Sequence, residues 1–292
     1  MNNSLAGTVQ PVIRTLDVQG AEGPLVARLY HLEASSVEGG KTKKEAKKDS
    51  LLVFFHGGGF VGGDLDDADP FLRRLSSSAS ANQLVLASCY TLATRKPFPA
   101  AVEDAHAVLV WARKNKAKLG WSGKYLVVAG IEAGANLAAV ASLMARDRGG
   151  PAIDGQILIM PMLDPGLTTC SMREVKLGDD MAKVADTCAA SYRGYLPNGA
   201  DRAHPYASPL RSSRLRNLPP ALILSTEDDP LRDEAEQYAA KLAAAGVSTT
   251  LRRLAPAPLQ EPDARNECAC QYLVLDEIVR FLGAFDRAAL PD

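Results

Sequence analysis

The sequence contains 292 residues, of which 47% are apolar and 23% are charged, and its formal net charge is -1 at pH 7. This composition supports a large buried core and excludes wholesale disorder, and the near-neutral charge argues against a nucleic-acid-binding protein, which would carry a basic excess. No apolar run approaches the ~20 residues needed to cross a membrane, so we expect no membrane-spanning segment and a single domain over residues 1–292.

The amino-terminal sequence and the cysteines both bear on location. The first residues, MNNSLAGTVQPV, contain no basic segment followed by an apolar one, so we expect no secretory signal. The five cysteines are an odd number without CxxC spacing, which is typical of reduced thiols. We therefore expect a cytoplasmic protein.

Strand-like and helix-like segments alternate along the chain. Short apolar or β-rich runs predict strands at 12–18, 25–31, 51–55, 84–87, 125–129, 157–160, 221–225 and 248–254. Apolar residues at helical spacing predict helices at 100–116, 132–144, 231–245 and 266–285. This alternation predicts an α/β fold, in which a mostly parallel sheet has helices on both faces.

Residues 164–218 interrupt the alternation, because they lack a clear strand and separate two predicted core strands. So long an excursion is uncommon inside a compact domain unless it is functional, and we expect an inserted cap over a pocket. The lysine-rich segment 34–49 is interpreted as a solvated loop. The acidic cluster at 64–67 is also placed in a loop, and since no spacing in the chain requires a metal, we expect neither a metal nor a cofactor.

A run of glycines, His56-Gly57-Gly58-Gly59-Phe60, directly follows the predicted strand at 51–55. Glycines let the backbone approach a ligand closely and point amide N–H groups at it, which an oxyanion hole requires. The motif therefore indicates a site at which negative charge is stabilised.

A second motif, Gly130-Ile131-Glu132-Ala133-Gly134, lies between a predicted strand and a predicted helix. It has the frame of the nucleophile elbow, G-x-S-x-G, in which small flanking residues permit a sharp turn that presents the central side chain. Glu132 occupies the central position here, where the motif has serine.

Together these motifs resemble those of the bacterial hormone-sensitive-lipase-like esterases, a family of α/β hydrolases. The similar segments are HGGGFVGGDLD (56–66), KPFPAAVEDA (96–105), AGIEAGANLAA (129–139), ARDRGGP (145–151), YASPL (206–210) and DPLRDEAE (229–236). The resemblance implies an α/β-hydrolase fold with a mostly parallel eight-stranded sheet, a helical cap and hydrolysis of small carboxylic esters. Because the region before the HGGG motif is short for that family, we expect a reduced or absent N-terminal cap. The resemblance also implies a possible homodimer through the strand at 248–254.

The resemblance assigns roles to individual positions. The oxyanion-hole donors of the family correspond to the amides of Gly58, Gly59 and Ala133. Asp229 corresponds to the acid of the Ser-His-Asp triad, Glu132 stands at the serine position, and Leu259 stands at the histidine position. Because Leu259 cannot transfer a proton and Glu132 is a weak nucleophile, the ordinary mechanism is disabled twice.

His204, Glu132 and Asp229 are the remaining polar residues that could take part in the site. The sequence has four histidines, and of these His204, in the expected cap, is the one that could swing over the pocket. The carboxylate of Glu132 should emerge at a helix N-terminus beside glycine amides, which favour negative charge. We therefore expect Glu132 to occupy or border its own oxyanion hole, and Asp229 to cap the helix that follows it.

Three functions are compatible with these residues. The first is a non-catalytic pseudohydrolase that binds a small ester-like ligand or a partner through the old pocket. The second is an enzyme that uses Glu132 as a general base for an elimination or cyclisation. The third is residual esterase activity from the oxyanion hole alone. We favour the first, because both proton-handling groups are absent.

Overall fold

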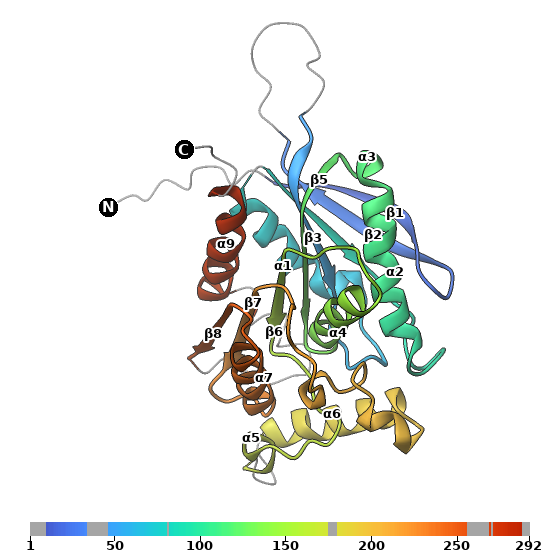
Figure 1. Ribbon diagram of the computed structural model, residues 1–292, viewed down its shortest axis with the longest axis vertical. Coiled ribbons are helices and arrows are strands. Elements are labelled where there is room, and N and C mark those ends of the chain that lie inside the picture. Colours follow the sequence, from blue (N-terminus) through green and yellow to red (C-terminus); the bar gives the residue numbers. More distant parts are fainter. Residues whose placement is uncertain are drawn as a thin grey trace, which may run out of the picture.

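The computed structural model describes residues 10–33, 46–80, 82–174, 180–255, 269 and 271–287. Within these residues eight strands form one sheet in the order β1-β2-β4-β3-β5-β6-β7-β8 (Figure 1). The strands are β1 (Val12–Gln19), β2 (Pro24–His31), β3 (Lys48–Phe55), β4 (Gln83–Ser88), β5 (Trp121–Ile131), β6 (Gly155–Ile159), β7 (Ala221–Thr226) and β8 (Thr249–Leu254). Strand β2 pairs antiparallel with β1 and β4, and every other pair is parallel, which confirms the predicted mostly parallel sheet.

Helices cover both faces of the sheet. They are α1 (Leu65–Ser78), α2 (Ala100–Lys114), α3 (Lys116–Leu119), α4 (Ala133–Asp147), α5 (Cys170–Arg173), α6 (Asp180–Tyr195), α7 (Arg232–Ala244) and α9 (Tyr272–Arg287). Buried residues of α2, α4 and α7 pack on one face, and those of α1 and α9 pack on the other. No helix in these ranges is both long enough and apolar enough to cross a membrane.

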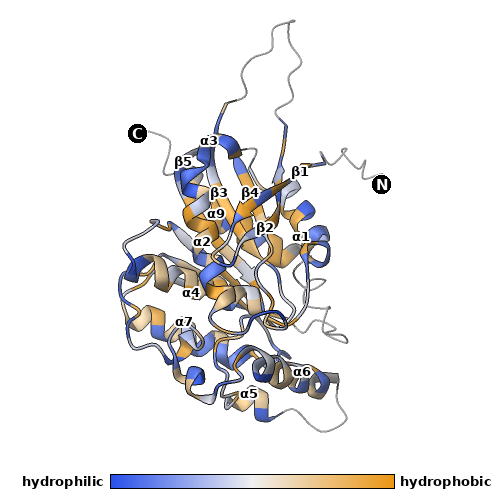
Figure 2. Cartoon of the chain, turned by 90° about the vertical axis from the view of Figure 1, so that its right-hand side faces the viewer, coloured by the Kyte–Doolittle hydropathy of each residue, from blue (hydrophilic) through white to orange (hydrophobic). Residues whose placement is uncertain are grey.

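The central strand β3 shows why the sequence forms this sheet. Leu51, Val53 and Phe55 point into the core beneath α2 and α4, whereas Leu52 and Phe54 point into the core beneath α1 and α9. Successive side chains of a strand face opposite sides, so a strand covered on both sides is apolar at every position. Figure 2 shows this hydrophobic character on the central strands.

Helix α1 corrects the prediction of a loop at the acidic cluster 64–67. The side chain of Asp64 accepts hydrogen bonds from the amides of Asp66 and Asp67, and the side chain of Asp67 accepts one from the Asp64 amide. This reciprocal pair is a capping box, which satisfies amides that the first helical turn leaves unpaired. The aspartates therefore begin a helix, whose apolar face includes Phe71 and Leu75.

Within the segment 164–218, helices α5 and α6 lie beyond the carboxyl ends of the central strands, whereas residues 212–217 lie near the opposite end of α4 and lead into β7. The segment contains α5, α6 and two short 3-10 helices, Gly199–Ala203 and Pro209–Arg211. Figure 1 shows α5 and α6 together past one end of the sheet, and ring contacts described below join α6 to the loop after β3. This arrangement places a helix over the glycine motif.

Candidate active site

The elbow between β5 and α4 holds Glu132 in an unusual backbone conformation. Its φ of 54° and ψ of -112° are values that side chains rarely adopt outside strained functional turns. The Glu132 amide donates to the carbonyl oxygen of Ile159 at 2.9 Å, and the Glu132 carbonyl oxygen accepts from Asn136 and Met162. A side chain at Gly134 would collide with the carbonyl group of Phe55, so the glycine lets α4 start against β3.

The carboxylate of Glu132 is bound by the glycine motif. Its Oε2 atom accepts hydrogen bonds from the amides of Gly58 at 2.7 Å and Gly59 at 3.1 Å. The two amides converge because Gly58 and Gly59 have φ values of 104° and 62°, which glycine adopts without steric cost. Glu132 is only 6% exposed, so these donors face a largely buried carboxylate. The expected contact between Glu132 and the glycine amides is present.

Tyr90 and His56 support the glycine motif from below. Their rings stack with centroids 4.4 Å apart, and the Tyr90 hydroxyl lies 3.2 Å from the carbonyl oxygen of His56. Nδ1 of His56 lies 2.7 Å from the carbonyl oxygen of Gly57, so Nδ1 must carry the proton and donate it there. Burial lowers the pKa of His56, which keeps the ring neutral. His56 is thus a structural donor within the loop.

Helix α6 covers the motif from above. The ring of Phe60 stacks on the ring of Tyr195 at 3.8 Å, with planes 5° apart. A side chain at Gly59 would collide with the side chain of Ser191, one helical turn earlier. Sequence analysis missed these cap residues and Tyr90. Buried α6 residues Val184, Cys188, Tyr192 and Tyr195 recur at helical spacing, and that pattern could have located the helix.

Asp229 follows β7, at the same edge of the sheet as Glu132, because β5, β6 and β7 are parallel neighbours. The side chain is 1% exposed, and Oδ1 accepts a hydrogen bond from the Leu231 amide at 2.9 Å. Its carbonyl oxygen accepts one from the amide of Arg232, the first residue of α7. Asp229 therefore organises the start of that helix.

The structure describes Ala133 but not Leu259, the other two positions to which the resemblance assigns roles. Ala133 is buried as the first residue of α4, where amide groups have no partner within the helix. Leu259 lies outside the described residues. In the part of the chain that is described, no group of three or more His, Cys, Asp or Glu side chains is placed to hold a metal ion.

Two further histidines are held by other groups. Nδ1 of His204 accepts a hydrogen bond from the Tyr206 amide at 3.0 Å, so in the neutral ring Nε2 carries the proton. The exposed His204 ring also lies against Phe98, at 5.4 Å between centroids. Nε2 of His106 lies 3.2 Å from the carbonyl oxygen of Gly150. His204 therefore presents no free lone pair while it keeps this contact, whereas Nε2 of His106 must donate to the Gly150 carbonyl oxygen, which ties that ring to the loop after α4.

A buried acid that sequence analysis missed lies beside this edge of the sheet. Glu234 of α7 has no exposed surface, and Oε2 accepts hydrogen bonds from the amides of Leu163 at 2.7 Å and Asp164 at 2.9 Å. Burial raises the pKa of Glu234 to about 8, and the charges of Asp164 and Asp229 act in the same direction. Through its two hydrogen bonds, Glu234 links α7 to residues 163 and 164, where the segment 164–218 begins.

Comparison with known proteins places these motifs in a family. Residues 52–258 match the family model described as alpha/beta hydrolase fold. Esterase LipI of Mycobacterium tuberculosis is 35% identical over 243 residues, which cover 82% of this chain and 72% of LipI. Carboxylic ester hydrolase LipN of the same organism is 38% identical over 248 residues, which cover 83% of this chain but only 62% of LipN.

Solved structures agree with this relationship. The hyperthermophilic esterase from the archaeon Pyrobaculum calidifontis has a TM-score of 0.79 at 32% identity, and the match covers 96% of this chain and 87% of that one. A fungal esterase from Rhizomucor miehei has a TM-score of 0.81 at 28% identity, with coverage of 97% and 85%. The chain is thus similar to esterases in both sequence and fold.

Proposed function

The chain belongs to the alpha/beta hydrolase family, and from this premise we propose that it is a non-catalytic relative of the carboxylesterases. In this proposal the fold is kept as a pseudohydrolase, and the old active-site region binds a small ester-like ligand or a partner. Fold alone does not imply function, so the proposal depends on the site.

One observation supports the proposal: Oε2 of Glu132 accepts hydrogen bonds from both glycine amides that we expect to form an oxyanion hole. In ester hydrolysis, amide donors bind the negative oxygen that develops in the transition state, and loss of one donor slows known enzymes by about 10²–10³-fold. Here the amides of Gly58 and Gly59 bind the chain's own carboxylate. A substrate carbonyl would have to displace it from both donors.

Proton transfer supports the same proposal. Serine-dependent hydrolysis needs a hydroxyl nucleophile and a base within hydrogen-bond reach. Position 132 is glutamate, and the sequence contains no histidine after His204. The alternative of Glu132 as a general base is weaker, because the same amides cannot bind Glu132 and a substrate oxyanion at once.

The test is hydrolysis of p-nitrophenyl acetate at high enzyme concentration, comparing the unmodified chain with Glu132→Ala and Glu132→Ser. We expect all three to equal the buffer blank. Turnover that the unmodified chain shows and Glu132→Ala lacks would make Glu132 a working catalytic group and end the proposal. Turnover that persists in all three proteins after further chromatography would support residual esterase activity that does not depend on Glu132 and would also end the proposal.

Location and assembly are further parts of the proposal. Cys89 and Cys170 form no disulfide within the part of the chain that the structure describes, which supports a reducing compartment such as the cytoplasm. Among the described strands β8 lies at an edge of the sheet, which supports pairing of its backbone with a second copy. Sedimentation of the full chain would test the homodimer.

A further inference from the structure

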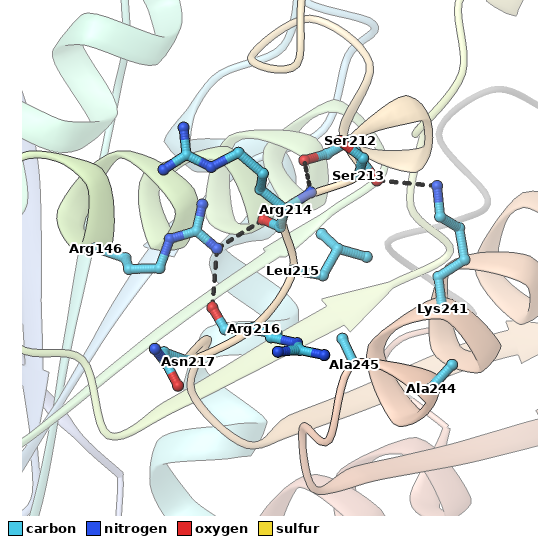
Figure 3. Close-up of a pocket in the computed structure, with 10 residues that line it drawn as sticks. All are labelled: Arg146, Ser212, Ser213, Arg214, Leu215, Arg216, Asn217, Lys241, Ala244 and Ala245. Carbon is cyan, nitrogen blue, oxygen red and sulfur yellow. Dashed lines mark hydrogen bonds between the residues drawn. The ribbon is translucent and has the colours of Figure 1, made fainter.

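A surface cavity of about 560 Å³ lies at the opposite end of α4 from Glu132. At about 1.5 Å of rise per residue, Arg146 near the end of α4 is about 20 Å from the elbow. The cavity lies between α4, α7 and the segment 212–217, which precedes β7 (Figure 3). Its lining residues are Arg146, Ser212, Ser213, Arg214, Leu215, Arg216, Asn217, Lys241, Ala244 and Ala245.

Two cations hold the segment 212–217 in place as one wall of this cavity. Nη1 of Arg146 donates hydrogen bonds to the carbonyl oxygens of Arg214 at 2.7 Å and Arg216 at 3.0 Å. Nζ of Lys241 donates to the carbonyl oxygen of Ser212 at 2.9 Å. Figure 3 shows Arg146 and Lys241 on opposite sides of the segment. These hydrogen bonds fix the backbone of the segment, and Arg214 and Arg216 remain exposed on it.

The cavity carries an excess of positive charge. Carbonyl oxygens satisfy the donors of Arg146 and Lys241 without cancelling their formal charges. Arg146 forms an ion pair with Asp147 at 2.7 Å, but among the described residues no acid forms an ion pair with Lys241, Arg214 or Arg216. The carboxyl ends of α4 and α7 add about half a negative charge each. A net charge of about +2 remains around the cavity.

We propose that this cavity binds a small organic phosphate monoester. A phosphate monoester carries a charge close to -2 at neutral pH, which matches the excess, and guanidinium groups bind phosphate oxygens in pairs. Beside the arginines, Leu215, Ala244 and Ala245 provide an apolar surface for the organic body of the ligand. The volume lies within the range of small-molecule sites.

The experiment is titration calorimetry of the full chain with phenyl phosphate at pH 7.5 and low ionic strength. The comparison ligands are inorganic phosphate, which lacks the apolar body, and benzoate, which has one negative charge. We expect saturable binding of phenyl phosphate, with a Kd at least about tenfold lower than that of either comparison ligand. The double variant Arg214→Gln/Arg216→Gln should raise the Kd for phenyl phosphate by about tenfold or more.

Arg95→Gln is the matched control, because Arg95 is an exposed arginine outside the cavity, and this variant should bind like the unmodified chain. Unchanged thermal unfolding of the double variant would show that it is folded. No saturable binding, or equal affinity in the folded double variant, would overturn the site. Equal affinity for inorganic phosphate or benzoate would overturn the assigned ligand class. None of these measurements uses ester hydrolysis, so failure here is separate from failure of the pseudohydrolase proposal.

Discussion

The amide nitrogen of Gly58 lies 2.7 Å from Oε2 of Glu132, although the two residues are 74 positions apart in the chain. This hydrogen bond joins the loop after β3 to the turn after β5. The same carboxylate oxygen also accepts from Gly59 at 3.1 Å. Glu132, at the turn between β5 and α4, thus supports the fold of the glycine motif.

This support predicts how substitutions at Glu132 affect stability. Glu132→Ala removes the acceptor of two largely buried amides, which should lower the free energy of unfolding by about 2 kcal/mol. Glu132→Gln keeps an oxygen acceptor but loses the charge, so the loss should be about 1 kcal/mol. Urea denaturation measures both values. Equal stability of all three proteins would show that the contact contributes nothing in solution.

The vacated site in Glu132→Ala should bind a small carboxylate. Acetate can place an oxygen between the amides of Gly58 and Gly59, and a ligand that binds only the folded state raises stability. We expect 100 mM sodium acetate to raise the Tm of Glu132→Ala by about 2 °C relative to sodium chloride of equal ionic strength. The unmodified chain should show no difference between the two salts. A shift of the same size in both proteins would contradict specific binding at this site.

The sheet was predictable because its signals are local. The central strands contain short apolar runs, such as 51–55 in β3 and 125–129 in β5, and strands covered on both faces have that composition. Helix α1 was missed because its start signal consists of aspartates at 64 and 67, which in isolation are typical of a solvated loop. The decisive observation is their position before the apolar residues Phe71 and Leu75 on one helical face.

The site was predictable only in part, because only some of its features are encoded by local sequence patterns. The glycine motif and the elbow at Glu132 are short patterns that specify their own backbone. Their supports, Tyr90 and Ser191, act through contacts between distant segments, which a single sequence does not display. The burial of Glu234 likewise depends on how α7 packs, so its raised pKa could not be foreseen from its exposed-looking acidic segment.

Glu234 should make stability depend on pH. Its pKa is about 8 in the folded chain, against a value of 4.5 for an unperturbed side chain, so between these pH values the folded state holds a proton that the unfolded state has lost. Stability from this group is therefore complete below pH 4.5 and is lost as pH rises toward 8. The loss between pH 5 and pH 8 should be about 3 kcal/mol.

Glu234→Gln isolates this contribution, because glutamine can accept the hydrogen bonds from Leu163 and Asp164 but does not titrate. Denaturation midpoints at pH 5, 6.5 and 8 should fall less steeply in the variant than in the unmodified chain. Parallel profiles would show that Glu234 keeps the same protonation state throughout this range.

The packing of α6 on the glycine motif predicts a coupling between Gly59 and Ser191. In Gly59→Ala the new methyl group would collide with the Ser191 side chain, and alanine is also strained at a φ of 62°. We expect a loss of about 3 kcal/mol, of which about 1 kcal/mol is backbone strain. Ser191→Gly removes the obstacle at a cost of about 0.5 kcal/mol in helix propensity. The free energy of unfolding of the double variant should therefore be higher, by at least about 1 kcal/mol, than the value obtained by adding the two single losses.

Gly246→Ala provides the matched control for this cycle. Gly246 also has a positive φ, of 81°, but a methyl group there would meet no atom of the described residues within 4 Å. In the double variant Gly246→Ala/Ser191→Gly, the two losses of stability should simply add. Backbone strain at Gly246 involves no contact with α6, so a change in α6 cannot relieve it. Additive losses in the Gly59 cycle as well would mean that α6 does not pack on the motif in solution. A coupling confined to Gly59 would show that α6 covers the amides bound by Glu132.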